Sequence, residues 1–87
     1  MIRILIIDDE LSAVRILKLL IEKHISVEKQ IEISSNPAEA LELMGTCQPT
    51  LVMLEIEMPG MNGFDFMNMA SEWDFYVIFT TAFDQYA

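Results

Sequence analysis

The sequence has few positively charged residues. Its 87 residues contain five Lys and Arg against 14 Asp and Glu, which gives a net charge of −9. Proteins that bind DNA or RNA need basic side chains to neutralise phosphates, so this balance argues against direct nucleic-acid binding by this segment. It favours metal cations and cationic partners instead.

Cysteine and long apolar runs are also scarce. Cys47 is the only cysteine, so the chain has no internal disulfide and no multi-cysteine metal site. No apolar run approaches the roughly 20 residues needed to span a bilayer. The short run after Met1 soon reaches Asp8 without the small-residue cleavage site of a signal peptide. We therefore expect a cytosolic protein, and its length allows a single domain.

Apolar runs alternate with segments of helical spacing along the chain. The patterns predict strands over residues 2–7, 30–35, 51–54 and 75–80, with helices over residues 11–24, 37–45 and 64–71. Near-continuous apolar strands separated by helices are typical of a parallel sheet with right-handed crossovers. The sequence therefore predicts an α/β fold.

Details of the second and third helices follow from single residues. Asn36 is expected to cap the second helix, with Glu39 completing a capping box and Gly45 ending it. In the third helix we expect the apolar side chains to pack inward; these are Phe64, Phe66, Met67, Met69 and Ala70.

Acidic residues follow two of the predicted strands. Asp8 and Asp9 come directly after the first, while Glu55 and Glu57 follow the third and lead into a Pro/Gly/Asn turn. Ligands of open parallel sheets bind outside the carboxyl ends of the strands. Carboxylate and carbonyl oxygens at such an edge suit Mg²⁺. Thr81, after the fourth strand, places a hydroxyl where it can donate to a phosphoryl oxygen.

Three motifs in this order resemble the receiver domain of bacterial two-component response regulators. They are Asp8-Asp9-Glu10, the Met-Pro-Gly-Met-Asn-Gly turn at residues 58–63, and Thr81-Ala82. Residues 78–87 resemble more specifically the LytTR (LytR/AlgR) branch. The resemblance implies a flavodoxin-like, doubly wound sheet of order 2-1-3-4-5, phosphorylation by a histidine kinase, and dependence on Mg²⁺.

The resemblance also implies roles for individual residues. Asp8 and Asp9 match the acidic pair that binds the metal, Glu57 matches the main-chain metal ligand, and Thr81 matches the hydroxyl that senses the phosphoryl group. Glu55 stands at the phosphoacceptor position and would be a further metal ligand.

Glu55 departs from the family, which uses Asp at that position. The extra methylene moves the carboxylate outward, and a misplacement of about 1 Å can reduce a rate about 100-fold. Three interpretations remain open. Glu55 is an inert replacement, a constitutive mimic of the phosphorylated state, or an ordinary solvated acid, and the intact acidic residues around it favour the first two.

The chain also departs from the family at its end. The family's fifth strand carries a lysine that pairs with the phosphoryl group, whereas the last lysine here is Lys29. We therefore expect residues 1–87 to form a single, partial receiver domain with strand order 2-1-3-4, without the last helices or a LytTR DNA-binding domain. The uncovered fourth strand predicts a homo-oligomer, formed edge to edge or by exchange of elements.

Two other classes of function remain open. The chain could be a non-signalling oligomerisation or interaction domain on the same scaffold. A metal-dependent phosphatase is less favoured, because the sequence offers no evident general base, and we expect the chain not to be an enzyme.

Overall fold

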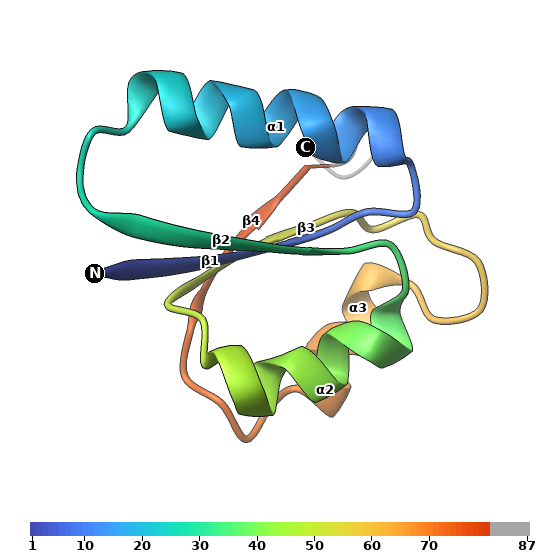
Figure 1. The fold of residues 1–87 in the computed structure, drawn as a ribbon. Helices are drawn as coiled ribbons and strands as arrows, with labels where there is room; N and C mark the ends of the chain where they lie inside the picture. The colour runs from blue at the N-terminus through green and yellow to red at the C-terminus, as the bar shows by residue number, and fades with distance from the viewer. Residues whose placement is uncertain (81–87) are drawn as a thin grey trace.

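Seven elements alternate along the chain in a computed structural model that describes residues 1–80. They are β1 (Ile2–Ile7), α1 (Leu11–His24), β2 (Lys29–Ser34), α2 (Pro37–Cys47), β3 (Leu51–Leu54), α3 (Gly63–Met69) and β4 (Tyr76–Phe79). The strands form one parallel sheet in the order β2-β1-β3-β4, which confirms the predicted topology. Figure 1 shows three layers, with α1 on one face of the sheet and α2 and α3 on the other.

The central strand β1 supplies side chains to both hydrophobic layers. Ile4 and Ile6 pack under α1 against Val14 and Ile21. Alternate residues point to the opposite face. There Leu5 and Ile7 join the cluster beneath α2 and α3, which also contains Ala40, Met44, Val52, Leu54, Met58, Phe66 and Ala70. Because β1 is buried on both faces, its sequence is a continuous apolar run rather than an alternating one.

The boundaries of α2 partly follow the predicted signals. Asn36 caps the helix, and its Oδ1 accepts hydrogen bonds from the main-chain N–H groups of Ala38 and Glu39 at 2.8 and 3.3 Å. The predicted capping box is not formed, because the N–H of Asn36 donates to Ser34 Oγ at 3.2 Å. Glu39 therefore contributes its main-chain N–H to the cap, whereas its side chain has no capping role.

The end of α2 was predicted wrongly at Gly45. The helix continues to Cys47, and Gln48 closes it in the left-handed region with a φ of 49°. Its N–H donates to the Met44 carbonyl at 3.2 Å. Met44 is buried against the sheet. This burial stabilises the last turn by more than the weak helix propensity of Gly45 destabilises it.

The inward orientation expected for α3 is only partly correct. Phe66 and Ala70 are fully buried, whereas Phe64 and Met69 are 47% and 59% exposed. A helix of seven residues presents one narrow stripe to the sheet, and positions four apart share that stripe. Phe64 instead lies beside Phe79 of β4, with ring centroids 5.6 Å apart.

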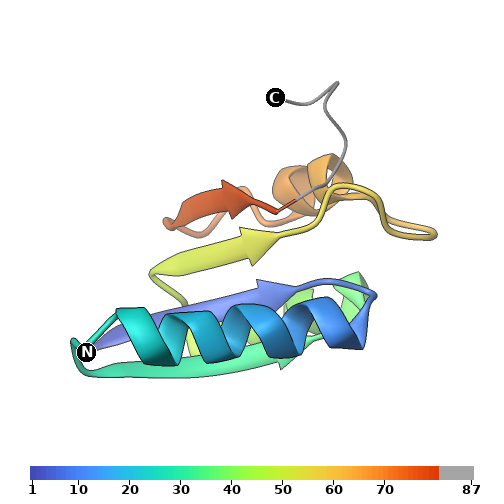
Figure 2. The same cartoon turned by 90° about the horizontal axis from the view of Figure 1, so that it is seen from above.

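Two apolar surfaces are uncovered in the part of the chain that the structure describes. Ile16, Leu19 and Leu20 are exposed on the outer side of α1. Within residues 1–80, no strand pairs with the outer edge of β4, and on the α1 face of this strand Tyr76 is 79% and Ile78 49% exposed. Figure 2 shows that α1 lies over β1 and β2 and leaves β4 uncovered.

Candidate functional site

The carboxyl ends of β1, β3 and β4 surround an acidic cavity of about 340 Å³. Its lining residues are Asp8, Asp9, Glu10, Ala13, Glu55, Glu57 and Thr80. Main-chain pairing continues past the strands here, because the N–H of Glu55 donates to the Ile7 carbonyl at 3.0 Å. The parallel arrangement therefore brings the predicted residues Asp8, Asp9, Glu55 and Glu57 to one cavity. Thr81 lies outside the described residues.

Asp8 is the buried carboxylate of this cavity, with 4% of its surface exposed. Its Oδ1 accepts a hydrogen bond from the N–H of Glu10 at 2.9 Å. Burial raises the pKa of Asp8, and the negative charges of Glu55, Asp9 and Glu10 add to this, although the hydrogen bond from Glu10 opposes the change. The ionised form of Asp8 is therefore costly in this site and is stabilised by any cation that enters it.

Glu55 is half-buried at the end of β3, and its carboxylate turns back toward its own loop. Oε1 accepts a hydrogen bond from the main-chain N–H of Glu57 at 3.1 Å. The contact joins residues two apart, like the one that the shorter Asp8 makes with the N–H of Glu10. The charge of Glu55 also acts on Asp8, which places the two carboxylates within electrostatic reach of each other.

The loop after Glu55 is fixed by close main-chain packing. Gly60 has a φ of +82°, which favours glycine. Gly63 donates its N–H to the Ile56 carbonyl at 2.9 Å, and a Cβ at this position would lie 2.8 Å from the carbonyl oxygen of Glu55. Asn62 then starts α3 through a reciprocal capping box with Asp65. The Gly residues of the turn therefore allow α3 to begin directly against the main chain of Glu55 and Ile56.

Thr80 is a cavity residue to which the sequence assigned no role. Its N–H donates to the Leu54 carbonyl at 3.0 Å, which places it beside Glu55 across the sheet. Its hydroxyl oxygen is buried and has no hydrogen-bond partner within residues 1–80. The position of Thr80 beside Glu55 follows from the register between β4 and β3. This register cannot be read from the sequence of either strand alone.

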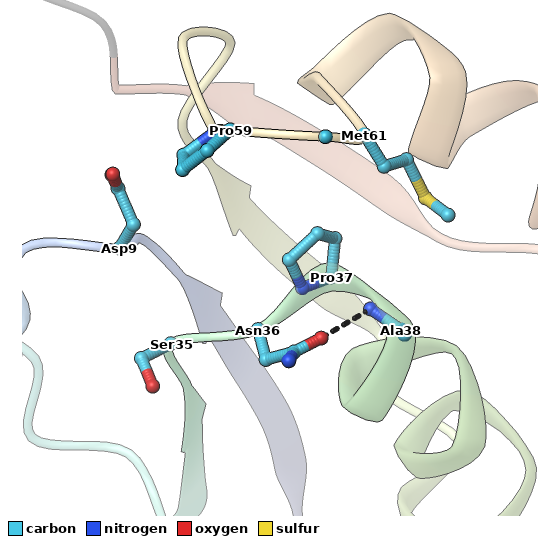
Figure 3. A pocket seen from close by; sticks show the side chains of 8 residues that line it. Asp9, Ser35, Asn36, Pro37, Ala38, Pro59 and Met61 are labelled. Carbon is cyan, nitrogen blue, oxygen red and sulfur yellow. Dashed lines mark hydrogen bonds between the residues drawn. The ribbon is translucent and has the colours of Figure 1, made fainter.

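A second cavity of about 320 Å³ adjoins the first and shares Asp9 with it. It lies between the loop that carries Asp9, the start of α2 and the Pro59–Met61 turn. In Figure 3 the Asn36 side chain points to the main-chain nitrogen of Ala38, so this end of α2 is already capped. This cavity forms a side extension of the acidic site rather than a separate anion site.

The donor set suits a hard divalent cation in its chemistry, because carboxylate oxygens line the cavity from two strand ends. The side chains are not gathered around one point. Among residues 1–80 the structure contains no group of three or more His, Cys, Asp or Glu side chains placed to hold a metal ion. Asp8 and Glu55 each use one carboxylate oxygen on a main-chain N–H.

The family model described as the response regulator receiver domain matches residues 4–87. The chain belongs to the response regulator receiver domain family. Receiver domains of this family are phosphorylated by histidine kinases and generally bind Mg²⁺ at the phosphorylation site. The family favours a receiver function over the non-signalling scaffold.

Two curated relatives support the predicted LytTR branch. The transcriptional regulatory protein BtsR of Salmonella typhi is 36% identical over 91 residues, which cover 100% of this chain and 36% of BtsR. The sensory transduction protein LytT of Bacillus subtilis is 35% identical over 89 residues, which cover 100% of this chain and 36% of LytT. Both are LytTR-type regulators. The receiver therefore spans about a third of the length of these relatives.

A third relative has a different overall activity. The protein-glutamate methylesterase/protein-glutamine glutaminase 3 of Burkholderia thailandensis is 43% identical over 68 residues, which cover 78% of this chain and 19% of that protein. Receiver domains of transcriptional regulators are generally not enzymes, but a receiver also occurs in this esterase. The relatives of this chain therefore include an enzyme as well as transcriptional regulators.

The fold is also that of solved receivers. The MaeR response regulator bound to beryllium trifluoride superimposes with a TM-score of 0.85 at 29% identity, over 97% of this chain and 70% of that chain. None of the helices within residues 1–80 has the length and apolar character required to cross a bilayer.

Proposed function

We propose that this receiver keeps the acidic site of its family but does not accept a phosphoryl group at a significant rate. The hydrogen bond from the Glu57 N–H to Glu55 Oε1 is the observation that carries this proposal. A carboxylate acts as a nucleophile only when an oxygen is aligned with the phosphorus atom and the leaving group. The Glu55 carboxylate is displaced by a methylene and is held by the loop.

The same hydrogen bond favours a mimic of the phosphorylated state over an inert replacement. A phosphoryl group on an aspartate would extend beyond the carboxylate and place negative oxygens near the loop. The side chain of Glu55 is one methylene longer than that of aspartate, so its carboxylate also lies further out. Its negative charge is at the N–H of Glu57. A carboxylate with this donor satisfies part of the hydrogen bonding that a phosphoryl oxygen would seek.

We propose Mg²⁺ as the cation of the acidic cavity. Asp8, Asp9 and Glu55 would supply carboxylate oxygens, and Glu57 would supply its main-chain carbonyl oxygen. Bound Mg²⁺ would neutralise part of the negative charge that raises the pKa of Asp8. Calorimetric titration with Mg²⁺ tests this. Asp9→Asn should weaken binding at least about tenfold, whereas Glu72→Gln, outside the cavity, should leave it unchanged.

Intact mass spectrometry after incubation with acetyl phosphate and Mg²⁺ tests the phosphorylation proposal. We expect no mass gain for the protein or for Glu55→Ala, and a gain of one phosphoryl group for Glu55→Asp. A gain in the protein that is lost in Glu55→Ala would overturn the proposal. A chimera that extends the chain through the fourth helix and fifth strand of a receiver from this family is the control for Glu55→Asp, because the family lysine lies on that strand. Failure of Glu55→Asp in that chimera would show that the pocket is not a working receiver site.

The proposed partners follow from the family and from composition. We propose a histidine kinase as the upstream partner, a cytoplasmic location, and no direct nucleic-acid contact by this segment, the last because of the net charge of −9. We also propose that residues 1–87, studied alone, associate through the uncovered edge of β4 or by exchange of elements. Neither a DNA-binding nor an enzymatic activity is proposed for this segment.

A further inference from the structure

Thr80 lines the acidic cavity at the end of β4. Thr80 directly follows β4, and its N–H donates to the Leu54 carbonyl at 3.0 Å. Leu54 pairs with Phe79 in the β3–β4 register, so the next pair along the two strands is Glu55 and Thr80. Both residues line the same acidic cavity. Thr80 is therefore the neighbour of Glu55 on the adjacent strand.

The hydroxyl oxygen of Thr80 is buried and unpartnered within the described residues. Buried polar side-chain atoms nearly always have a hydrogen-bond partner, and a valine would fill the same volume without a polar group. We therefore expect the Thr80 hydroxyl to have a nearby hydrogen-bond acceptor. It would reach this acceptor after a small change in the conformation of the site.

Glu55 is the acceptor that the geometry offers. One of its carboxylate oxygens accepts from the Glu57 N–H, and a carboxylate can accept several hydrogen bonds. Oε2 receives no donor among residues 1–80. Asp8 is a less suitable acceptor because it follows β1, which is separated from β4 by β3 in the sheet.

We propose that Thr80 is a positioning residue for Glu55, whose carboxylate accepts hydrogen bonds from both the Thr80 hydroxyl and the Glu57 N–H. The carboxylate would then be held from two sides, by the end of β4 and by the loop after β3. This inference rests on the proposed function, because Glu55 stands at the phosphoacceptor position. It makes the position of Glu55 depend on the conformation of the chain directly after β4.

A double-mutant cycle on folding stability tests this contact. The variants are Thr80→Val, Glu55→Ala and their combination in the intact protein, measured by urea denaturation without Mg²⁺ or phosphodonor. We expect Thr80→Val to lower the folding equilibrium constant about three- to tenfold more with Glu55 present than with Glu55→Ala. Thr46→Val, at an exposed position of α2, is the matched control and should show no coupling to Glu55→Ala.

The amide of Glu57 provides a spectroscopic signature that a purely structural role would not change. Its hydrogen exchange and proton chemical shift report how firmly Glu55 is held against the loop. We expect Thr80→Val to speed this exchange and shift the resonance, and Thr80→Ser, which keeps the hydroxyl, to restore both. The amide serves as a second readout if one of the variants is too unstable for the denaturation cycle.

An additive cycle, together with a Glu57 amide that Thr80→Val leaves unchanged, would overturn the inference. The same holds if Thr80→Val stabilises the protein irrespective of residue 55, because the hydroxyl would then be only an unpaired group. None of these results depends on phosphorylation. They are therefore distinguishable from failure of the proposed function, which is read from the mass of Glu55→Asp.

Discussion

The carboxylates of Asp8 and Glu55 favour cation binding but lower the stability of the folded protein. Both carboxylates lie at strand ends and face one cavity, and each accepts one main-chain hydrogen bond. Asp8 is nearly fully buried, whereas Glu55 is half-buried. A site that concentrates negative charge for a cation lowers the stability of the fold until the cation is bound.

The raised pKa of Asp8 leads to a prediction about stability and pH. Below the unfolded-state value near 3.8, Asp8 is protonated in both states and its ionisation costs nothing. As the pH rises through the higher folded-state pKa, the folded protein must ionise a buried group, and stability is lost. Asp8→Asn, which keeps an acceptor for the Glu10 N–H, should therefore raise the free energy of unfolding at pH 7 by about 0.5–2 kcal/mol.

Urea denaturation without metal at a series of pH values checks this prediction. The gain of Asp8→Asn should shrink as the pH falls toward 3.8. Glu72→Gln removes an exposed carboxylate outside the cavity and should change stability by less than about 0.5 kcal/mol at any pH. Equal or lower stability of Asp8→Asn at pH 7 would show that the buried charge is already compensated in the folded protein.

The turn between β3 and α3 packs closely against the end of β3 that carries Glu55. Gly63 lies so close to the main chain of Glu55 and Ile56 that a methyl group would meet backbone atoms at 2.8 and 2.9 Å. We expect Gly63→Ala to destabilise the fold by about 1–3 kcal/mol, because the backbone after β3 must move. The same movement should displace Glu55 and shift the amide resonance of Glu57.

Gly45 provides the matched control for Gly63. It lies inside α2, and an added Cβ there would meet nothing within 4 Å. Gly45→Ala should therefore stabilise the protein by about 0.5–1 kcal/mol, since alanine favours the helix. Thermal denaturation of both variants is the measurement. A similar effect of the two substitutions would contradict the close contact at Gly63.

The sequence predicts elements well where hydrophobic patterns dominate. The continuous apolar run of β1 and the helical spacing of α1 gave the right elements, because burial against the core decides both. The capping box at Glu39 was wrong, because the hydroxyl of Ser34 takes the N–H that Glu39 would have bound. The inward packing of Phe64 was wrong because α3 has only one buried stripe.

The candidate site was predictable in its carboxylates but not in its geometry. The parallel order places the ends of β1 and β3 together, so Asp8, Asp9, Glu55 and Glu57 meet as expected. The hydrogen bond that folds Glu55 back on its loop depends on the loop conformation. The role of Thr80 depends on the register between β3 and β4, which no local pattern encodes.

The exposed apolar surface of the molecule favours association between copies of the chain. Among the described residues, α1 exposes Leu19 and β4 exposes Tyr76 and Ile78. Exposed apolar strands at a sheet edge promote pairing with another chain, and large apolar patches rarely remain uncovered in a monomer. A net charge of −9 on each copy opposes association, more strongly at low salt.

We expect residues 1–87 to associate at micromolar concentrations, and more so as the ionic strength rises. Sedimentation velocity measures this directly. Ile78→Lys places a charge on the open edge and should shift the population toward monomer, whereas Leu19→Lys, on the outer side of α1, should have less effect. A stable, well-folded monomer at all salt concentrations would contradict association. If both variants shift the population toward monomer equally, the contact does not lie at the edge of β4.

We propose that this receiver has a site built for phosphorylation and that Glu55 prevents the reaction. A competition measures this directly: the protein and an isotopically heavier Glu55→Asp variant, both extended through the family's fifth strand, react with acetyl phosphate and Mg²⁺ in one tube. Intact mass then gives both extents of labelling under identical conditions. We predict that Glu55→Asp is labelled at least about 100-fold faster. Labelling of the Glu55 protein at a similar rate would show that Glu55 does not prevent phosphorylation.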